Sequence, residues 1–406
     1  MTAALLSAGD IIEVTTERLA YGGDAVARHN GLAVFVPLAA PGERLRVRVT
    51  DLKKNFARAV IEQVLIPADS RREAPCRYFG ECGGCQLQHI NYAAQLEAKA
   101  GFVRDALERV GRIDWPHEIE IRHAGEFGYR ARARIKIERR NEAPPRIGFA
   151  RAGSRSVCDV ASCAILLPEL DAALASLREA VSNNPELIAT SGAVAEINIG
   201  AGDSAVSFEP QVAGLPGGGL SRRVAGFSLR FSPATFFQVN PLMLETLVSE
   251  AVGKESGSLA FDLFAGVGLF TLPLARHYAR VIGVESDHRA VDFARENAEA
   301  NGLTNVEVHR ATAGSWLERC AALRNTAPDL ILLDPPRVGA ANISPHVVAS
   351  KASRITYVSC DPTTLARDLR KLLDGGYELR RVVALDMFPQ TYHVETVVGL
   401  ARKELG

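Results

Sequence analysis

From about residue 240 onward, short apolar runs alternate with helical stretches, and this alternation restricts the fold more than any other feature of the sequence. The apolar runs are Leu259–Phe264, Val281–Val284, Val306–Val308, Leu330–Leu333 and Ile355–Val358. Strands that alternate with helices are typical of an α/β fold with a doubly wound, mostly parallel sheet. Because such sheets bind ligands at the carboxyl ends of their strands, the residues that follow each run are the first candidates for a functional site.

The first apolar run leads into a glycine-containing turn that predicts a site for a nucleoside-type cofactor. Gly266 and Gly268 let the backbone turn tightly and approach a ligand closely. Glu285 ends the next run and is placed to accept hydrogen bonds from ribose hydroxyls. Thr271 replaces the third glycine of a dinucleotide fingerprint, and Asp262 suits the cationic amino-acid end of S-adenosylmethionine but repels a pyrophosphate. We therefore expect S-adenosylmethionine here, with NAD and a plain structural turn as the alternatives.

Two later strand ends carry candidates for chemistry. Asp334 closes the fourth run and lies at the ligand-binding edge of the expected sheet. Cys360 follows the fifth run and is followed at once by Asp361-Pro362, a helix start with proline at the first helical position. A helix amino terminus favours the thiolate, which is the nucleophilic form of cysteine. We interpret Cys360 as a nucleophile, and an inert core thiol is the alternative.

A thiolate at a methyl-donor site indicates methylation of a pyrimidine at carbon 5. That carbon is a poor nucleophile, and thiolate attack at carbon 6 activates it. A base must then remove the carbon-5 proton so that the thiol can leave. In the expected strand Thr391–Val397, residues Thr391, His393 and Glu395 share one face, and Glu395 is its only carboxylate. We predict Glu395 as this base, against the alternative of an ordinary surface glutamate.

The amino-terminal half of the chain is the basic half, although the net charge of the whole chain is zero. Residues 1–66 predict four or five short strands and a small barrel of the OB type. Arginines alternate with apolar residues in Arg44–Val49, and Arg130–Ile137 places four cations on one strand face that only Glu138 continues. Like charges on one face repel, so we interpret the second row as phosphate-binding, with a solvated face as the alternative.

Seven cysteines include a cluster that predicts a metal site. Cys76, Cys82 and Cys85 lie within ten residues, and Cys158 and Cys163 form a later pair. Such spacing indicates an iron–sulfur cluster in a cytoplasmic chain, with zinc as the alternative. The sequence has no apolar run of about 18 residues and no basic segment before an apolar stretch at its start. We therefore expect a cytoplasmic protein without a membrane span.

Together these motifs resemble the family of S-adenosylmethionine-dependent RNA uracil-C5 methyltransferases, over nearly the whole chain. The matching segments are Ala20–Gly23, Pro41–Glu43, Cys76–Cys85, Asp159–Leu166, Phe236–Asn240, Asp334–Arg337, Ser359–Pro362 and Met387–Glu395. The resemblance implies that Cys360 is the nucleophile and Glu395 the base. It also implies that Gln238, Gly266, Glu285 and Asp334 line the cofactor and uracil pocket.

The resemblance further implies a [4Fe–4S] cluster held by four cysteines, Cys76, Cys82, Cys85 and Cys163, which selects Cys163 over Cys158. The chain departs from the family pattern at Thr312, where an aspartate usually lies near the cofactor adenine. It departs again at Ala131-Arg132, in the strand that usually reads Tyr-Arg-Asn-Lys.

By the same resemblance we expect three domains. These are a TRAM-type RNA-binding barrel (1–66), a mixed α+β iron–sulfur RNA-binding domain (67–89 and 113–232) and a Rossmann-like methyltransferase domain (90–112 and 233–406). The TRAM domain and cluster favour 23S ribosomal RNA as the substrate, and the protein is expected to be a monomer. The alternatives are a transfer RNA substrate, methylation of an exocyclic amine, and a non-catalytic iron–sulfur RNA-binding or redox-sensing protein.

Overall fold

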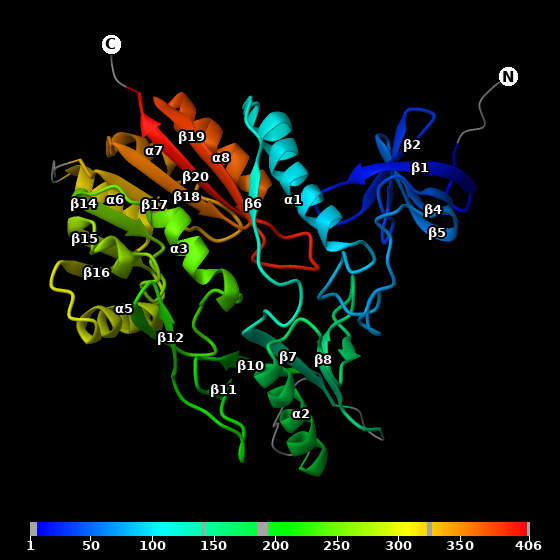
Figure 1. The fold of residues 1–406 in the computed structure, drawn as a ribbon, viewed down its shortest axis with the longest axis horizontal. Coiled ribbons are helices and arrows are strands. Elements are labelled where there is room, and N and C mark those ends of the chain that lie inside the picture. The colour runs from blue at the N-terminus through cyan, green and yellow to red at the C-terminus, as the bar shows by residue number, and fades with distance from the viewer. Residues whose placement is uncertain (1–5, 140–142, 185–193, 323–326, 404–406) are drawn as a thin grey trace. The chain divides into compact units, whose positions relative to one another are not determined.

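The computed structural model describes residues 6–139, 143–184, 194–322 and 327–403. The chain forms two compact units (Figure 1). The first unit contains Met1–Phe102, Phe149–Cys158 and Phe388–His393, and the second contains Val103–Gly148, Asp159–Met387 and Val394–Gly406. The chain therefore returns to the first unit for a short segment just before Glu395.

The first unit contains a closed five-stranded barrel with strand order β1-β2-β3-β5-β4. Its strands are β1 (Ile11–Leu19), β2 (Ala25–His29), β3 (Leu32–Val36), β4 (Arg44–Leu52) and β5 (Phe56–Ile66). In β4, exposed arginines alternate with buried Leu45, Val47 and Val49, because successive side chains of a strand point to opposite faces. The barrel predicted from residues 1–66 is confirmed.

The second unit is built on an eight-stranded sheet of order β16-β15-β14-β17-β18-β20-β19-β6. Its strands are β14 (Gly257–Leu263), β15 (Tyr278–Glu285), β16 (Val306–Arg310), β17 (Leu330–Leu333), β18 (Arg354–Ser359), β19 (Tyr377–Leu385), β20 (Glu395–Arg402) and β6 (Glu120–Arg122). Strands β14 to β18 are parallel to one another, whereas β20 is antiparallel to both β18 and β19. The predicted doubly wound, mostly parallel sheet is confirmed.

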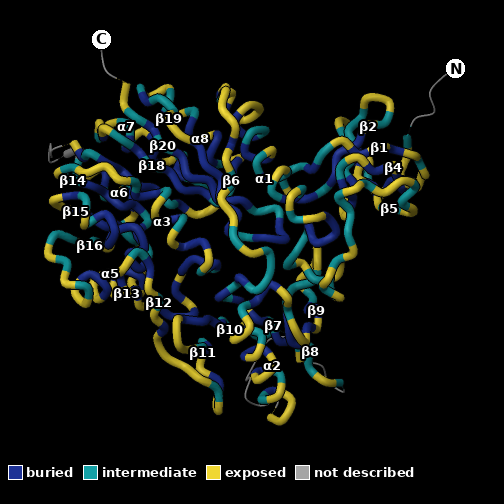
Figure 2. The backbone as a smooth tube through the Cα atoms, viewed as in Figure 1, coloured by how far each residue is buried: buried dark blue, intermediate teal, exposed yellow. Residues whose placement is uncertain are grey.

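Helices cover this sheet in two layers, and the strands between them are largely buried (Figure 2). Contacts join α3 (Leu244–Val252) to α4 (Thr271–Leu274), and join α6 (Ala313–Ala322), α7 (Ser344–Ala349) and α8 (Pro362–Asp374) in series. Helix α5 (His288–Ala300) packs on β15 and β16. In α8, Leu365, Leu369 and Leu372 recur at helical spacing and are buried, so this face packs inward.

The remaining elements form a smaller sheet and its connections. The sheet has the order β11-β10-β7-β8-β9, and a two-stranded ribbon joins β12 to β13. The strands are β7 (Arg132–Glu138), β8 (Arg146–Ala150), β9 (Val157–Asp159), β10 (Val194–Ala201), β11 (Val206–Glu209), β12 (Leu220–Val224) and β13 (Phe227–Phe231). The helices are α1 (Tyr92–Ala106), a π-turn η1 (Leu107–Gly111), α2 (Pro168–Asn183) and a 3-10 turn η3 (Pro241–Met243).

The expected strand Thr391–Val397 is shorter than predicted, because β20 begins only at Glu395. Gln390 has a left-handed backbone with φ of 67°, which interrupts an extended strand. The Gln390 amide donates to Gln95 Oε1 at 3.1 Å, and its carbonyl accepts from the amides of Gln86 and Leu87. The residues before Glu395 therefore form a buried loop. Among the described residues, no helix is long and apolar enough to cross a membrane.

Candidate active site

The register of β18 against β20 brings Cys360 and Glu395 together. Ser359 pairs with Thr396 at the last position of this antiparallel ladder, and Cys360 and Glu395 are the residues next to that pair. The charge of Glu395 acts on the Cys360 thiol, so the two side chains lie near each other. The sheet itself thus brings together two residues that lie far apart in the sequence.

Arg337 and Asp334 complete the charged surroundings of this pair. Both follow β17, which lies beside β18 in the sheet. Burial, and then the negative charge of Asp334, raise the pKa of Glu395 well above its ordinary value, and the Arg337 guanidinium opposes this shift. Glu395 therefore loses its proton less readily than an exposed glutamate, and a cation among these carboxyls lowers its pKa.

Burial acts against the expected effect of the helix start on Cys360. Burial raises the pKa of the Cys360 thiol to about 12, and the charge of Glu395 adds to the rise. The amides at the start of the helix are occupied by another residue, because the Asp361 side chain accepts from the amides of Thr363 and Thr364, each at 2.9 Å. Among the groups around Cys360, Arg337 lowers its pKa through its charge and through a hydrogen bond.

Asp262 lies inside β14 and is completely buried. Its Oδ2 accepts a hydrogen bond from the Thr271 hydroxyl at 2.5 Å, whereas its Oδ1 has no donor among the described residues. Burial raises the pKa of Asp262 to about 7, and burial together with the charge of Asp262 raises the pKa of Asp334 to about 7. A buried carboxylate oxygen without a donor fits a site that takes a cation. Thr271, which stands where the dinucleotide pattern has a glycine, instead fixes this carboxylate.

The glycine turn also fits the expected cofactor. Gly266 has φ of 55°, and a Cβ placed there meets no other atom within 4 Å, so the turn leaves open space beside its backbone. Gly268 is different, because a Cβ there comes within 2.7 Å of Leu272. Glu285 ends β15 and accepts from the Gly266 amide at 3.0 Å and from the Asp287 amide at 2.8 Å. The open cradle at Gly266 and the Glu285 carboxylate fit a ribose-bearing cofactor.

Sequence analysis missed the residue that fastens the loop of Gln238. Gln238 is buried. The half-buried Arg132 donates to the Pro233 carbonyl at 2.7 Å and to the Phe237 carbonyl at 2.8 Å, two points of the segment that leads to Gln238. Burial lowers the pKa of Arg132 to about 10. The sequence contains no signal that distinguishes this internal arginine from the exposed cations on the same strand face.

Several of the Arg130–Ile137 cations have partners within the protein, and phosphate binding by this row stays a prediction. Arg132 is used internally, and Lys136 lies opposite Glu196 of β10, with a contact of 2.5 Å. Arg134 is 3.5 Å from the same carboxylate. The neutralising acid lies on a strand that is distant in the sequence, where inspection of one strand does not find it. Thr312, the departure from the family pattern, accepts from the Ser315 amide at the start of α6.

The predicted cluster cysteines fall in both units. Cys76, Cys82 and Cys85 are half-buried in the first unit, and Cys163 belongs to the second. The Gly84 amide donates to Cys82 Sγ at 3.4 Å, a contact that suits a thiolate ligand. Cys158 is buried and donates to Glu81 at 3.5 Å. In the part of the chain that the structure describes, no three His, Cys, Asp or Glu residues are grouped to hold a metal ion.

Comparisons with known proteins agree with this fold. The family model described as tRNA (Uracil-5-)-methyltransferase matches residues 224–403, and the TRAM domain model matches residues 7–61. The 23S rRNA (uracil(1939)-C(5))-methyltransferase RlmD of Salmonella choleraesuis is 37% identical over 97% of this chain and 96% of its own length. An uncharacterized RNA methyltransferase of Aquifex aeolicus is 34% identical over 97% of this chain and 99% of its own.

A solved structure shares the fold of the chain. The tRNA (uracil-54, C5)-methyltransferase of Pyrococcus abyssi, in complex with S-adenosyl-L-homocysteine, has a TM-score of 0.72, 25% identity, and coverage of 96% of this chain and 100% of its own. The doubly wound sheet and the comparisons together define an S-adenosylmethionine-dependent methyltransferase. More narrowly, the chain belongs to the family of RNA uracil-C5 methyltransferases.

Proposed function

We propose that the protein methylates carbon 5 of a uridine in 23S ribosomal RNA through a covalent adduct with Cys360. The observation that carries the proposal is the proximity of Cys360 and Glu395 at the end of the β18–β20 ladder, together with Asp334 and Arg337. The RNA target follows the curated relatives that are named for 23S ribosomal RNA. Transfer RNA is the alternative, because the structural relative is named for transfer RNA.

The side chains divide the reaction between them. The Cys360 thiolate adds to carbon 6, and the resulting enolate is nucleophilic at carbon 5. S-adenosylmethionine supplies a methyl group on a positively charged sulfur. Glu395, near Cys360 at the end of the ladder, then takes the carbon-5 proton, and the electrons of that C–H bond form the C5–C6 double bond as the Cys360–carbon-6 bond breaks. Arg337 stabilises the thiolate before attack and after release.

The pocket residues hold the methyl donor in this proposal. Asp262 faces its ammonium or sulfonium charge, because its Oδ1 is buried without a donor among the described residues. Glu285 accepts from the ribose hydroxyls, the backbone at Gly266 gives the cofactor close approach, and Gly268 shapes the turn by leaving room for Leu272. Gln238 and Asp334 line the uracil side of the pocket.

Trapping with 5-fluorouracil-substituted 23S ribosomal RNA tests the mechanism. Fluorine cannot leave carbon 5 as a cation, so we expect a stable protein–RNA adduct that depends on S-adenosylmethionine. Cys360→Ala abolishes the adduct, whereas the matched control Cys320→Ala keeps it. Trapping by Cys360→Ala, or full methylation of ordinary RNA by that variant, contradicts the covalent mechanism. The second result is the one that methylation of an exocyclic amine predicts.

The choice of substrate needs a separate experiment. Transcripts of 23S ribosomal RNA and of transfer RNA are methylated with radiolabelled donor, and the methylated nucleotide is mapped. We expect incorporation into 23S ribosomal RNA only. Preferential incorporation into transfer RNA rejects the proposed substrate while leaving the chemistry intact, and the absence of transfer to either RNA leaves the non-catalytic alternative.

We also propose that Cys76, Cys82, Cys85 and Cys163 hold a [4Fe–4S] cluster with a structural or RNA-positioning role. Four thiolates suit such a cluster, and the Gly84 amide on Cys82 Sγ supports a charged sulfur. Anaerobically purified protein is expected to absorb visible light through thiolate–iron charge transfer. Cys163→Ala loses this absorbance and Cys158→Ala keeps it. A colourless protein that contains one zinc per chain contradicts the cluster.

The remaining proposals concern the whole chain. We infer three functional segments: an RNA-binding barrel (1–66), an iron–sulfur RNA-binding domain (67–89 and 113–232) and a methyltransferase domain (90–112 and 233–406). We also infer a monomer that acts in the cytoplasm. Light scattering of the purified protein alone and with RNA tests the monomer.

A further inference from the structure

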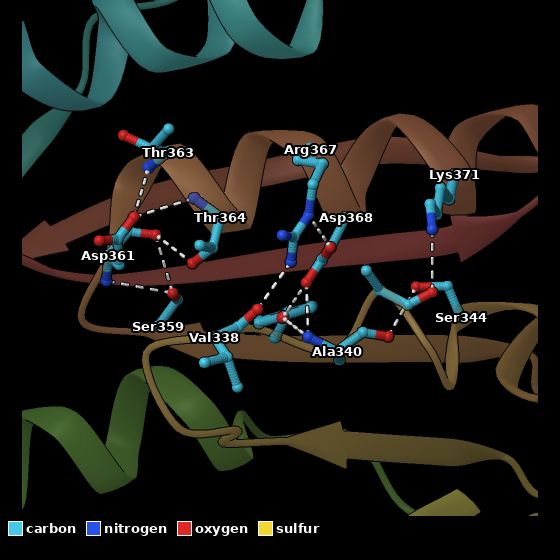
Figure 3. A network of polar contacts seen from close by, with 12 residues as sticks. Val338, Ala340, Ser344, Ser359, Asp361, Thr363, Thr364, Arg367, Asp368 and Lys371 are labelled. Atoms are coloured by element: carbon cyan, nitrogen blue, oxygen red, sulfur yellow. Dashed lines mark hydrogen bonds and ion pairs between the residues drawn. The ribbon is translucent and has the colours of Figure 1, made fainter.

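A buried carboxylate on α8 anchors the loop that carries Arg337. Asp368 is completely buried, and its Oδ2 accepts from the Tyr357 hydroxyl at 2.8 Å and from the Ala340 amide at 2.6 Å. Tyr357 belongs to β18, so the anchor joins the helix, the strand and the loop. Figure 3 shows Asp368 reaching from the helix to Ala340.

The same helix holds the loop at two further points. Arg367 donates to Asp368 Oδ1 at 2.9 Å and to the Val338 carbonyl at 2.8 Å, and Lys371 donates to the Ala341 carbonyl at 3.0 Å (Figure 3). The backbone is therefore fixed from Val338 to Ala341, although the Val338 side chain is 74% exposed. Gly339 has φ of 78°, and a Cβ there would clash with Asp368 Oδ2. The glycine at position 339 therefore leaves the space that the Asp368 carboxylate occupies.

The anchored loop leads directly to the reactive thiol. Arg337 immediately precedes Val338, and its guanidinium hydrogen-bonds Cys360. Cys360 directly follows β18, the strand that contains Tyr357. Asp368 therefore holds both the strand that precedes Cys360, through Tyr357, and the loop that follows Arg337, through Ala340.

We propose that Asp368 and Tyr357 are positioning residues that hold the Arg337 guanidinium against Cys360. The proposal rests on the proposed function for the role of Cys360 as nucleophile. Among the described residues, the charged groups that face Cys360 are Glu395 of β20 and Asp334 and Arg337 of the loop after β17, and Arg337 is the cation of this set. Burial and Asp368 raise the pKa of Tyr357, so its hydroxyl remains a donor at every working pH.

The test measures local charge at Cys360 without RNA or methyl donor, so it does not depend on the reaction. The protein is alkylated with iodoacetate and, separately, with iodoacetamide, and modification of the Cys360 peptide is followed by mass spectrometry. The two reagents have nearly the same size and leaving group, so the ratio of their rates cancels accessibility and reports nearby positive charge. The variants are Tyr357→Phe, Asp368→Asn and Arg337→Ala. The matched control is Tyr377→Phe, which removes another buried hydroxyl that donates to the Ala352 carbonyl at 2.9 Å.

We expect the iodoacetate-to-iodoacetamide ratio to fall about tenfold in Arg337→Ala, because the guanidinium attracts the carboxylate of iodoacetate but not the neutral iodoacetamide. The effect of Arg337 on the pKa of the thiol acts on both reagents alike and cancels in the ratio. In Tyr357→Phe the ratio falls toward the value of Arg337→Ala. In the double variant the ratio is no lower than in Arg337→Ala alone. Tyr377→Phe keeps the wild-type ratio. The ratio of Asp368→Asn is used only if the melting temperature shows that this variant is folded. If it is not folded, Tyr357→Phe alone tests the proposal.

Three results overturn the proposal. One is a wild-type ratio in Tyr357→Phe, which leaves the anchor without influence on Arg337. Another is an equal fall in Tyr377→Phe, which assigns the effect to loss of any buried hydroxyl. The last is a further fall when Tyr357→Phe is added to Arg337→Ala, which shows a route that does not pass through Arg337. None of them depends on whether Cys360 attacks uracil, which the fluorouracil experiment decides.

Discussion

Replacing Asp262 by asparagine is predicted to stabilise the fold while it damages the cofactor site. Burial raises the pKa of Asp262 from 3.8 to about 7, so the folded state holds the proton more tightly than the unfolded state does. For such a carboxyl, stability is highest at low pH and falls as the pH rises from about 4 to about 7. The asparagine side chain carries no charge at any pH and does not contribute to this loss.

The magnitude follows from the pKa values. Above pH 7 the charged Asp262 costs the folded state about three pKa units, or about 4 kcal/mol. The asparagine leaves a buried amide group imperfectly bonded, at a cost of about 1–3 kcal/mol that does not depend on pH. The net stabilisation is therefore about 1–3 kcal/mol at about pH 8.5. Between about pH 5.5 and 8.5 the advantage of the variant grows by about 2 kcal/mol, because about 1.5 pKa units of the shift lie in that range.

Urea unfolding of both proteins at these two pH values, without methyl donor, measures this difference. The control is Asp329→Asn, at the opposite end of β14, where Asp329 Oδ2 accepts from the amides of Ser258 and Leu259. That variant is expected to lose about 1–3 kcal/mol. An Asp262→Asn advantage that stays constant or shrinks with rising pH refutes the reasoning, because the carboxylate of Asp262 is then not destabilising the folded state.

Three further predictions concern binding, turnover and stability. The affinity for S-adenosylmethionine, measured by calorimetry, rises from about pH 6 to about pH 8, because a cation prefers ionised Asp262; a flat profile in the wild type contradicts this. Glu395→Gln accumulates a Cys360 adduct with ordinary uridine RNA on denaturing gels and releases methylated RNA at least about 100-fold more slowly; unchanged release removes Glu395 as the base. Arg132→Met leaves the Pro233 and Phe237 carbonyls without this donor and lowers thermal stability by about 1–3 kcal/mol, whereas an unchanged melting temperature contradicts its fastening role.

The sheet edge that carries the candidate active site was predictable because doubly wound sheets place strand ends together. Residues that follow apolar strands, such as Asp334 and Cys360, therefore meet at one edge whatever lies between them in the chain. The position of Glu395 could not be predicted from strand ends alone. It depends on an antiparallel strand, β20, that lies between β18 and β19 in one particular register. The resemblance to a family supplied what the local pattern did not contain.

The electrostatics of the site were not predictable in the same way. The helix start after Cys360 indicated a thiolate, but the burial of the thiol and the nearby Glu395 raise its pKa instead. The row of cations in β7 indicated a phosphate site, but Glu196 lies across the sheet from Lys136. Both differences have one origin: charge interactions depend on distance in space and on solvent, and neither follows from separation along the chain.

The sequence by itself determined the barrel, the order of strands and helices, and the candidate reactive residues at the strand ends, because periodicity and turns are local properties of the chain. Only the tertiary structure decided which carboxyls have raised pKa values, which arginines are internal, and that Asp368 on a helix fastens the Arg337 loop. Burial and the approach of distant charges set those properties, and they exist only once the chain has folded.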